Sequence, residues 1–223
     1  HNLLIVEDCA EAIGARYKDS IIGTHGDCSC FSFFANKTLT TGEGGMAIFR
    51  KKKDADRAKI LRDHGMSKEK KYWHQFSGFN YRMTNMQAAI GVAQIKKIEI
   101  MLKNKKKIFN YYDSKLSKDE RISLLPKNNW SENSYWIYTL RLKNFSEIGR
   151  DKFLKKLKNR GIECRPGFYP LNLMEPFKAF GKNGLKTSKL ISLNSISLPS
   201  AANLTNQDQD YITKIFFDEL DKF

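Results

Sequence analysis

The sequence predicts an α/β protein, in which a mainly parallel sheet with flanking helices is followed by a small α+β part. Residues 3–6 and 28–34 are apolar on both faces, as the buried strands of parallel sheets are. Residues 84–116 then keep helical spacing. Shorter alternating and amphipathic segments follow them, which is typical of a small α+β domain.

The first half contains three expected strands and one short helix. The apolar run 3–6 is the first strand, the aromatic-rich segment 28–34 is the second, and 46–49 is the third. A helix is expected over 54–62. The first strand is predicted to be buried on both faces.

The longest helix is expected to begin at Thr84. Thr84 and Gln87 have the spacing of a capping box, in which two side chains satisfy free N–H groups at the helix start. Apolar residues then recur at helical spacing: Met86, Ile90, Ala93, Ile98, Leu102, Phe109, Tyr112 and Leu116. A helix this long more often bridges two domains than lies inside one. We therefore expect one domain over 1–104 and a second over 105–223.

The second half alternates strands and helices. Residues 135–142 have the pattern of a half-buried strand, and 151–160 that of an amphipathic helix. Gly161 stands where a helix end favours a left-handed residue, and a strand is expected over 161–165. The last helix is capped by Thr205. Its expected buried residues are Tyr211, Ile212, Ile215, Phe216 and Leu220.

Composition excludes a disordered chain and a membrane-spanning one. Of the 223 residues 41% are hydrophobic, and 15 Phe, 9 Tyr and 3 Trp can form a core. No apolar run approaches the roughly 20 residues that span a bilayer. The net charge of +15 comes mainly from lysine runs such as 50–53, 68–71 and 103–107. We expect a lysine-rich solvated surface that steers anionic substrates, with nucleic-acid binding as the weaker alternative.

The four cysteines are too few and too scattered for a disulfide framework. Without a secretory signal pattern in the sequence, a reducing cytoplasm is the expected compartment. Cys28 and Cys30 lie near His25, but two thiolates need two more ligands at suitable spacing. We therefore expect buried cysteines rather than a metal site.

Two polar segments flank expected elements. In 6–12, Asp8 follows the end of a buried strand, where α/β proteins bind ligands, although this segment by itself favours a helix cap at Asp8. In 78–90, Asn80 and Arg82 lie in a loop that leads into the long helix. A capped loop with a solvent-facing arginine explains this second segment equally well.

The segment between them carries a lysine after an aromatic strand. Lys37 loses hydration there, which favours the neutral amine that Schiff-base chemistry needs. Ser32 can donate a hydrogen bond to a phosphate, and the glycines of 42–45 allow the backbone to reverse close to a ligand. An ordinary surface lysine before a turn remains the alternative.

Together these segments resemble one family closely, the DegT/DnrJ/StrS group of pyridoxal-phosphate-dependent nucleotide-sugar aminotransferases, which have fold type I. The matching motifs are VEDCAEAIGA, GDCSCFSFFANKTLTTGEGGM and GFNYRMTNMQAAIG, with looser matches at GIECRPGFYPLN and SISLPS. The resemblance implies that 1–104 is the C-terminal portion of the large cofactor-binding domain with the start of the linking helix. Residues 105–223 would form the small domain.

The resemblance also implies roles for five residues. Lys37 would be the catalytic residue, which forms the Schiff base with pyridoxal phosphate. Asp8 would pair with the protonated pyridine nitrogen, and Glu11 would lie beside the 3-hydroxyl of the cofactor. Ser32 would hold the phosphate. Asn80 would reach the phosphate of the neighbouring subunit's cofactor, which implies a homodimer with shared active sites.

The implied reaction is a ping-pong transamination by a Schiff-base mechanism. Glutamate, the usual donor in the family, would give its amino group to a nucleotide-linked 4-keto-6-deoxy sugar and so form the 4-amino sugar. Lys37 argues against the related dehydratases, which have histidine there. The amino-acid sequence around Lys37 is most similar to that of perosamine synthases. At Asn172, by contrast, the chain departs from the histidine that family members often have at this position.

The sequence starts inside the first expected strand. Family members carry a substantial segment before it, with further strands, a phosphate-binding loop and an aromatic that stacks on the pyridine ring. We therefore expect a fragment or a truncated gene product. The alternative function is that of a non-catalytic or partner-dependent remnant of such an enzyme.

Overall fold

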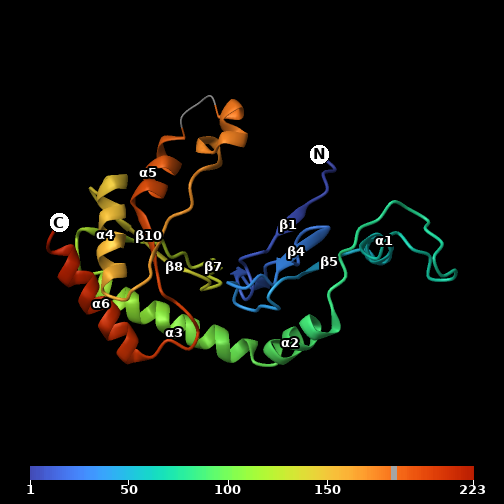
Figure 1. Ribbon diagram of the computed structural model, residues 1–223, viewed down its shortest axis with the longest axis horizontal. Helices are drawn as coiled ribbons and strands as arrows, with labels where there is room; N and C mark the ends of the chain where they lie inside the picture. The colour runs from blue at the N-terminus through green and yellow to red at the C-terminus, as the bar shows by residue number, and fades with distance from the viewer. Residues whose placement is uncertain (182–184) are drawn as a thin grey trace. The chain divides into compact units, whose positions relative to one another are not determined.

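The computed structural model describes residues 1–181 and 185–223, which form two compact units. The first comprises 1–102 and 128–136, and the second comprises 103–127 and 137–223. The boundary near residue 102 falls inside helix α3 (Ile98–Leu116), which runs from one unit into the other (Figure 1). The assignment of 1–104 to a large cofactor-binding domain and of 105–223 to a small domain stays a prediction.

The first unit is built on a three-stranded sheet with the order β1-β4-β5. Its strands are β1 (Val6–Asp8), β4 (Cys28–Ser32) and β5 (Gly45–Phe49), followed by helix α1 (Lys52–Arg62). β1 and β4 are parallel, with Asp8 opposite Cys30, whereas β4 and β5 are antiparallel (Figure 1). The carboxyl ends of β1 and β4 therefore lie at the same edge of the sheet.

A second, smaller sheet joins distant parts of the first unit. β2 (Arg16–Tyr17) pairs with both β3 (Ser20–Ile21) and β7 (Ser131–Glu132). Lys18 also donates its backbone N–H to the carbonyl of Trp130, at 2.6 Å. These contacts tie the segment 128–136 to the residues just after β1.

The predicted strand over 3–6 is wrong in its position and its burial. The strand begins at Val6, and the side chains of Leu3 and Leu4 are 77% and 79% exposed. The backbone of Ile5 is still held, because its carbonyl accepts the N–H groups of Asp27 and Cys28. The apolar side chain of Ile5 is exposed as well. A strand that is apolar on both faces is expected to have a covering layer on each face, and the described residues do not provide these layers.

The predicted long helix is two helices, α2 (Asn85–Ile95) and α3. Its start is confirmed, because the hydroxyl of Thr84 accepts the N–H of Gln87 while the Gln87 side chain accepts the N–H of Thr84. The helix ends where the N–H of Lys97 turns back to the carbonyl of Gln94, three residues before it. Apolar spacing continues across this turn, so periodicity alone predicted one helix.

The second unit contains a four-stranded antiparallel sheet with the order β6-β8-β10-β9, together with further helices and the C-terminal part of α3. The strands are β6 (Ile122–Leu124), β8 (Tyr138–Leu142), β10 (Ser195–Leu198) and β9 (Arg165–Pro166). The helices are α4 (Glu147–Asn159), α5 (Lys186–Asn194) and α6 (Asn206–Leu220), with 3₁₀ turns over Leu171–Leu173 and Glu175–Phe180. Fully buried side chains include Tyr112, Leu140, Phe153, Ile196 and Phe216.

Three predicted elements of this unit differ in their limits. β8 begins at Tyr138 rather than 135, because Tyr135 has a left-handed backbone (φ +54°) that no strand contains. α4 begins at Glu147 rather than 151, because the Ser146 hydroxyl accepts the N–H of Gly149 and caps it there. The strand predicted over 161–165 is reduced to β9.

The helix ends were predicted better. Gly161 has the expected left-handed backbone, with φ +79°. Thr205 caps α6 in a capping box with Asp208, and four of its five predicted core residues are buried. The fifth, Tyr211, is 49% exposed, because its hydroxyl reaches the carbonyl of Arg160 at the helix edge.

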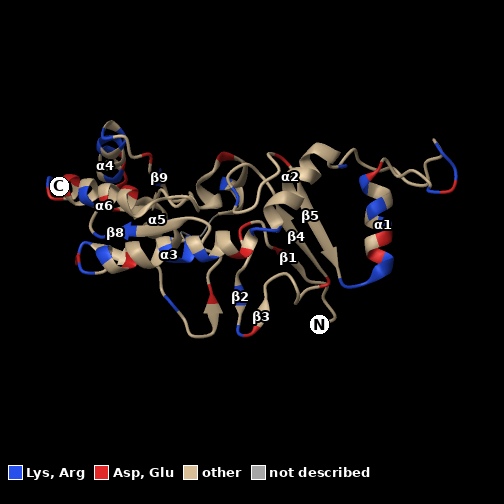
Figure 2. Cartoon of the chain, turned by 90° about the horizontal axis from the view of Figure 1, so that it is seen from below, with Lys and Arg blue, Asp and Glu red and all other residues tan. Residues whose placement is uncertain are grey.

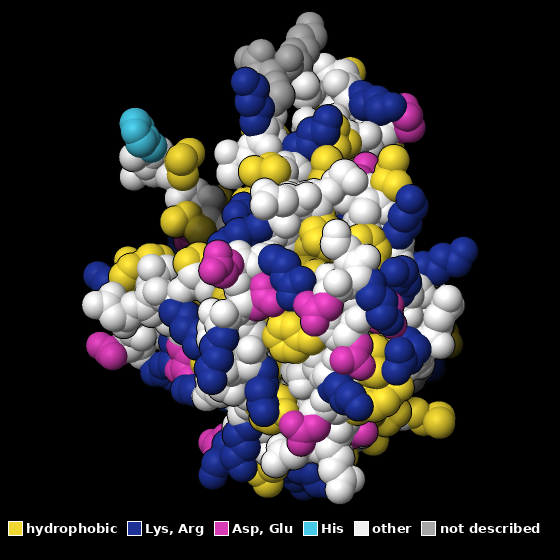
Figure 3. Space-filling view, turned by 90° about the vertical axis from the view of Figure 1, so that its left-hand side faces the viewer, with side chains coloured by type: hydrophobic (Ala, Val, Ile, Leu, Met, Phe, Trp, Pro, Cys, Tyr) yellow, Lys and Arg dark blue, Asp and Glu magenta, His cyan; other side chains and the backbone are white. Residues whose placement is uncertain are grey.

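Charged side chains are spread over both units. Lys and Arg lie on helices and loops alike, with Asp and Glu among them (Figure 2). The face at the left of Figure 1 shows the same mixture of both charge signs (Figure 3). Among the described helices, none combines the length and the apolar character of a membrane span.

Candidate functional site

Asp8 and Ser32 mark the shared carboxyl edge of β1 and β4. Asp8 is exposed, and its Oδ1 accepts the N–H of Ala10 at 3.0 Å. Residues 9–15 form turns and no helix, so the interpretation of Asp8 as a helix cap is wrong. Ser32 Oγ accepts the N–H of Phe34 at 3.2 Å, which leaves the hydroxyl proton available to a ligand.

Lys37 is largely enclosed by its neighbours. Its Nζ lies 3.1 Å from Oε1 of Glu11 and 3.8 Å from the centre of the Trp136 ring. The side chain of Lys37 is 11% exposed, whereas that of Glu11 is 52% exposed. The sheet edge therefore carries a primary amine between a carboxylate and an aromatic face.

The loop that carries Lys37 is fixed by its own backbone and by helix α2. The N–H of Thr41 donates to the carbonyl of Phe33, and the N–H of Phe33 donates to the carbonyl of Gly44, both at 2.9 Å. The side-chain amide of Gln94 on α2 contacts both backbone groups of Thr40, at 3.1 Å to the N–H and 2.7 Å to the carbonyl. The backbone is therefore fixed on both sides of Lys37, at Phe33 before it and at Thr40 and Thr41 after it.

Glu7 lies beside Asp8 but has a different task. Its two carboxylate oxygens accept the backbone N–H groups of Gly23, His25 and Gly26, at 2.8, 2.7 and 2.6 Å. The N–H of Gly26 above all, with those of Gly23 and His25, holds the pKa of Glu7 below its ordinary value, against the opposing effect of burial. Glu7 thus fixes the loop before β4, while the alternation of the strand turns Asp8 to the other face.

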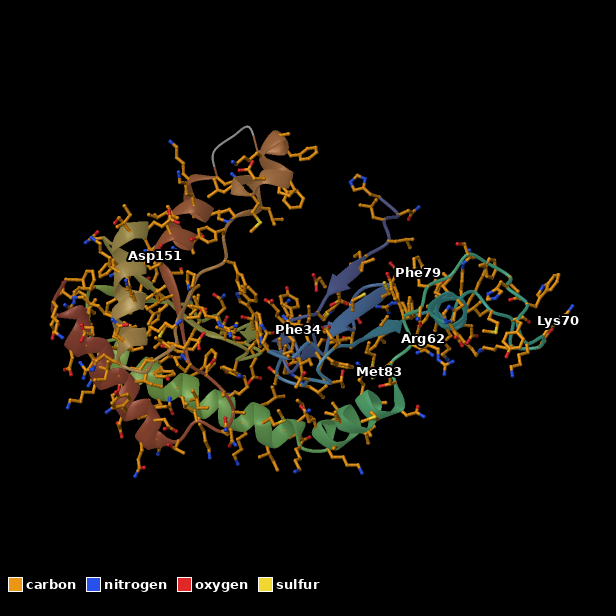
Figure 4. All side chains as sticks on the ribbon, viewed as in Figure 1. Phe34, Arg62, Lys70, Phe79, Met83 and Asp151 are labelled. Atoms are coloured by element: carbon orange, nitrogen blue, oxygen red, sulfur yellow. The ribbon has the colours of Figure 1, made fainter. Side chains whose placement is uncertain are left out.

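Asn80 lies in a segment that pairs with the end of α1. Its backbone forms a bridge with Asp63, and Phe79 donates its N–H to the carbonyl of Leu61 at 2.7 Å. In Figure 4, Phe79 lies close to Arg62, and Met83 lies farther along toward α2. Among the contacts of the described residues, none joins Asn80 to the other four predicted site residues.

Only part of the predicted site is therefore brought together. Lys37 and Glu11 are in contact, and Asp8 and Ser32 end neighbouring strands. The sequence analysis missed Trp136 and Gln94. Trp136 lies 99 positions after Lys37 and was assigned to a strand, and no local pattern connects the two residues.

The chemistry of these groups fits pyridoxal phosphate. The cofactor needs an amine for its aldehyde, an acceptor for its protonated ring nitrogen and donors for its phosphate. Lys37, the exposed carboxylate of Asp8 and the hydroxyl of Ser32 are groups of these kinds, and all three follow or end strands at one sheet edge.

Comparison with known proteins points the same way. A GDP-perosamine synthase of Caulobacter vibrioides is 39% identical over 213 residues, which are 95% of this chain and 57% of that protein. The Helicobacter pylori aminotransferase PseC, which is involved in the biosynthesis of pseudoaminic acid, matches with a TM-score of 0.93 and 25% identity over all of this chain and 61% of its own. The pyridoxal-phosphate form of the Streptococcus pneumoniae sugar aminotransferase Spr1654, itself described as putative, matches with a TM-score of 0.88 and 29% identity over 98% of this chain and 58% of its own.

The chain spans a little over half the length of these curated relatives, the GDP-perosamine synthases that it matches. These structural matches confirm the predicted α/β class, that of pyridoxal-phosphate fold type I. Aminotransferases of this kind depend on pyridoxal phosphate. Residues 1–217 match the profile of the DegT/DnrJ/EryC1/StrS aminotransferase family, to which this chain belongs.

Proposed function

We propose that the chain is the part that carries the catalytic Lys37 of a pyridoxal-phosphate-dependent aminotransferase. This enzyme converts a nucleotide-linked 4-keto-6-deoxy sugar into its 4-amino derivative. The observation that carries the proposal is the enclosed Lys37 amine, 3.1 Å from the carboxylate of Glu11 at the carboxyl edge of β1 and β4. A primary amine that is held in this way can both form a Schiff base and transfer a proton.

Each predicted residue has a separate task in this proposal. When bound, pyridoxal phosphate supplies an aldehyde that condenses with amines and a ring that accepts an electron pair. The carboxylate of Asp8 would hold the ring nitrogen in its protonated form, and the hydroxyl of Ser32 would bind the phosphate. Glu11 would lie beside the 3-hydroxyl and hold Lys37.

Lys37 would also move the proton of the reaction. After the amino donor has taken its place, Nζ of Lys37 would accept the proton from the α-carbon of glutamate and deliver it to the C4′ carbon of the bound cofactor in the same half-reaction, and in the second half-reaction it would move a proton the opposite way, from C4′ to the sugar carbon. The ammonium that forms in between would be stabilised by Oε1 of Glu11 and by the face of Trp136, which both lie within 4 Å of Nζ.

The relatives support the choice of substrate. The GDP-perosamine synthase shares 39% identity with the chain, and a Campylobacter jejuni transaminase that is named for a UDP-linked 4-amino-4,6-dideoxy sugar shares 26%. Both names describe amino sugars on nucleotides. An excess of lysine at the surface would attract such anionic substrates.

We also propose a cytoplasmic homodimer with shared active sites. The four cysteines are free in the structure, which suits a reducing compartment. The loop that carries Asn80 exposes the stacked rings of Phe79 and Tyr81, and α2 exposes Met86. A second copy of the chain would cover these apolar groups and bring Asn80 to the phosphate of the partner's cofactor.

Borohydride trapping tests the central proposal. The chain is incubated with pyridoxal phosphate, reduced and digested, and the peptide that carries the reduced adduct is identified by mass spectrometry. We expect the adduct at Lys37 and its loss in Lys37→Arg, which keeps the charge but cannot form the adduct. Labelling of Lys37 that is no stronger than that of exposed lysines such as Lys70 would contradict the proposal.

Turnover separates the enzyme from a non-catalytic remnant. The chain is assayed with glutamate and a panel of GDP- and UDP-linked 4-keto-6-deoxy sugars, with Lys37→Ala as the control. Amino-sugar formation that Lys37→Ala abolishes would support the enzyme, whereas an adduct at Lys37 without turnover would favour the remnant.

Mixing two inactive variants tests the shared sites. Neither Lys37→Ala nor Asn80→Ala alone should be active. A mixed dimer keeps one site with both native residues, so an equal mixture should recover about a quarter of the native activity. No recovery after verified exchange of subunits would contradict the role of Asn80 across the dimer.

A further inference from the structure

The indole ring of Trp136 covers the amine of Lys37. Nζ lies 3.8 Å from the ring centre, well within the distance at which a cation is attracted to an aromatic face. The indole Nε1–H also donates to the carbonyl of Asn36, at 2.8 Å. The ring therefore contacts the reactive side chain and is fixed to the residue just before it.

The burial of Lys37 supports the importance of this ring. Glu11, the other described partner of the amine, is itself 52% exposed and can shield Lys37 on one side only. The side chain of Lys37 is nevertheless 11% exposed. A lysine side chain has four flexible carbon–carbon bonds, so a contact on a second side removes most of its alternative positions.

Trp136 is held by the structure of its own segment. Strand β7 pairs Glu132 with Arg16, and the ring of Trp130 packs edge-on against that of Tyr17 at 5.8 Å. The backbone then turns through the left-handed residue Tyr135, with φ +54°, directly before Trp136. Segment 128–136 thus belongs to the first unit and ends at the tryptophan that covers Lys37.

We propose that Trp136 is a positioning residue for Lys37, which holds the amine beside Glu11 so that it meets the cofactor aldehyde in one orientation. This inference rests on the proposed function, because it assumes that Lys37 forms the Schiff base. The ring acts through its face on Nζ and through its N–H on the carbonyl of Asn36. Two variants separate these contacts: Trp136→Phe keeps a ring and loses the N–H, and Trp136→Leu loses both.

The first experiment measures where pyridoxal phosphate is trapped by borohydride. The ratio of adduct at Lys37 to adduct at Lys52, whose side chain is 88% exposed, is compared between the native chain and the variants. We expect a fall of roughly tenfold in Trp136→Leu and a smaller fall in Trp136→Phe, since one cation–π contact and one hydrogen bond are lost in turn. The matched control is Trp73→Leu, which removes an exposed ring 4.3 Å from Lys70 and leaves Lys37 untouched.

A folded Trp136→Leu variant, checked by circular dichroism, that keeps the native ratio or raises it would overturn the proposal. The control should leave the adduct at Lys37 unchanged, so a fall there would equally count against a specific role of Trp136.

A second experiment needs no tryptophan variant. With lysines labelled by carbon-13 at the ε position, the signal that disappears in Lys37→Arg belongs to Lys37. We expect it upfield of the signals of lysines that contact no ring, because Nζ of Lys37 lies 3.8 Å from the centre of the Trp136 ring. A Lys37 signal among those of solvated lysines would overturn the inference. If the native chain traps no adduct at Lys37 but the signal is upfield, the proposed function fails while the contact with Trp136 stands.

Discussion

Replacing Glu7 by Gln tests how the first strand holds the loop before β4. In the native chain Oε1 accepts the N–H groups of His25 and Gly26, and Oε2 accepts that of Gly23. A glutamine has one acceptor oxygen. The orientation that keeps the two bonds at Oε1 turns an NH₂ group toward the N–H of Gly23, where donor meets donor.

The expected loss of stability has two parts. The N–H of Gly23 is left without an acceptor, which costs about 1–3 kcal/mol for a partly buried donor. The bonds from the N–H groups of His25 and Gly26 change from a charged to a neutral acceptor. Hydrogen bonds to a neutral acceptor are roughly half as strong, which gives a loss of about 1 kcal/mol. We therefore expect Glu7→Gln to lower the free energy of unfolding by about 2–4 kcal/mol at pH 7.

The effect should depend on pH with a definite sign. The backbone N–H groups lower the pKa of Glu7 in the folded chain, so its carboxylate stabilises the fold fully above the unfolded value of about 4.3. This contribution is lost as the pH falls through the lower folded value. Glutamine does not titrate, so the difference between the native chain and Glu7→Gln should shrink on acidification.

Urea unfolding, followed by circular dichroism at a series of pH values from neutral to acidic, measures this difference. Glu69→Gln is the control, because Glu69 is exposed and its substitution should change stability by less than about 0.5 kcal/mol. A Glu7→Gln variant as stable as the control, or a difference that stays constant across the pH series, would refute the reasoning.

Three further substitutions test other contacts. Gly78→Ala places a Cβ 2.1 Å from the backbone nitrogen of Gly65, so it should lower the free energy of unfolding by about 3 kcal/mol or more and speed proteolysis of the loop around it. In the control Gly42→Ala the added Cβ meets no atom within 4 Å, so the loss should be about 1 kcal/mol, from the positive φ alone. Gln94→Leu removes both side-chain bonds to Thr40 and should speed amide exchange of Thr40 by about tenfold or more; an unchanged rate would show that α2 does not hold the loop. Phe153→Ala empties a fully buried site and should cost about 3–5 kcal/mol in urea unfolding, against less than about 0.5 kcal/mol for a substitution of a neighbouring exposed residue on the same helix.

Local chemistry explains which elements could be predicted. The capping box at Thr84 and the helix cap at Thr205 were predicted at the correct residues, because such caps depend on residues about three positions apart and need no tertiary contact. The break between α2 and α3 was missed, since apolar spacing continues through it. The central strand β10 was missed because its position depends on pairing with β8, more than 50 residues earlier.

The candidate site divides in the same way. The motifs predicted that Lys37 and Glu11 belong to one site, and the structure places them in contact. The motifs do not predict that Gln94 fixes the backbone of Thr40, because a glutamine on a helix carries no local sequence signal for such a contact. The exposed residues 3–6 were mispredicted for a related reason: burial depends on what covers a residue as much as on its own apolar character.

The position of the Lys37 amine depends on three separate parts of the chain. Its own loop closes through Phe33 and Thr41, helix α2 holds that loop through Gln94, and segment 128–136 covers the amine with Trp136. Of these contacts, only the closure of the loop lies within the motifs that identify the family, since Gln94 follows the end of the third motif and Trp136 lies farther along the chain. A relative can therefore keep every motif around its lysine and still hold the amine differently, if the segment that corresponds to 128–136 differs.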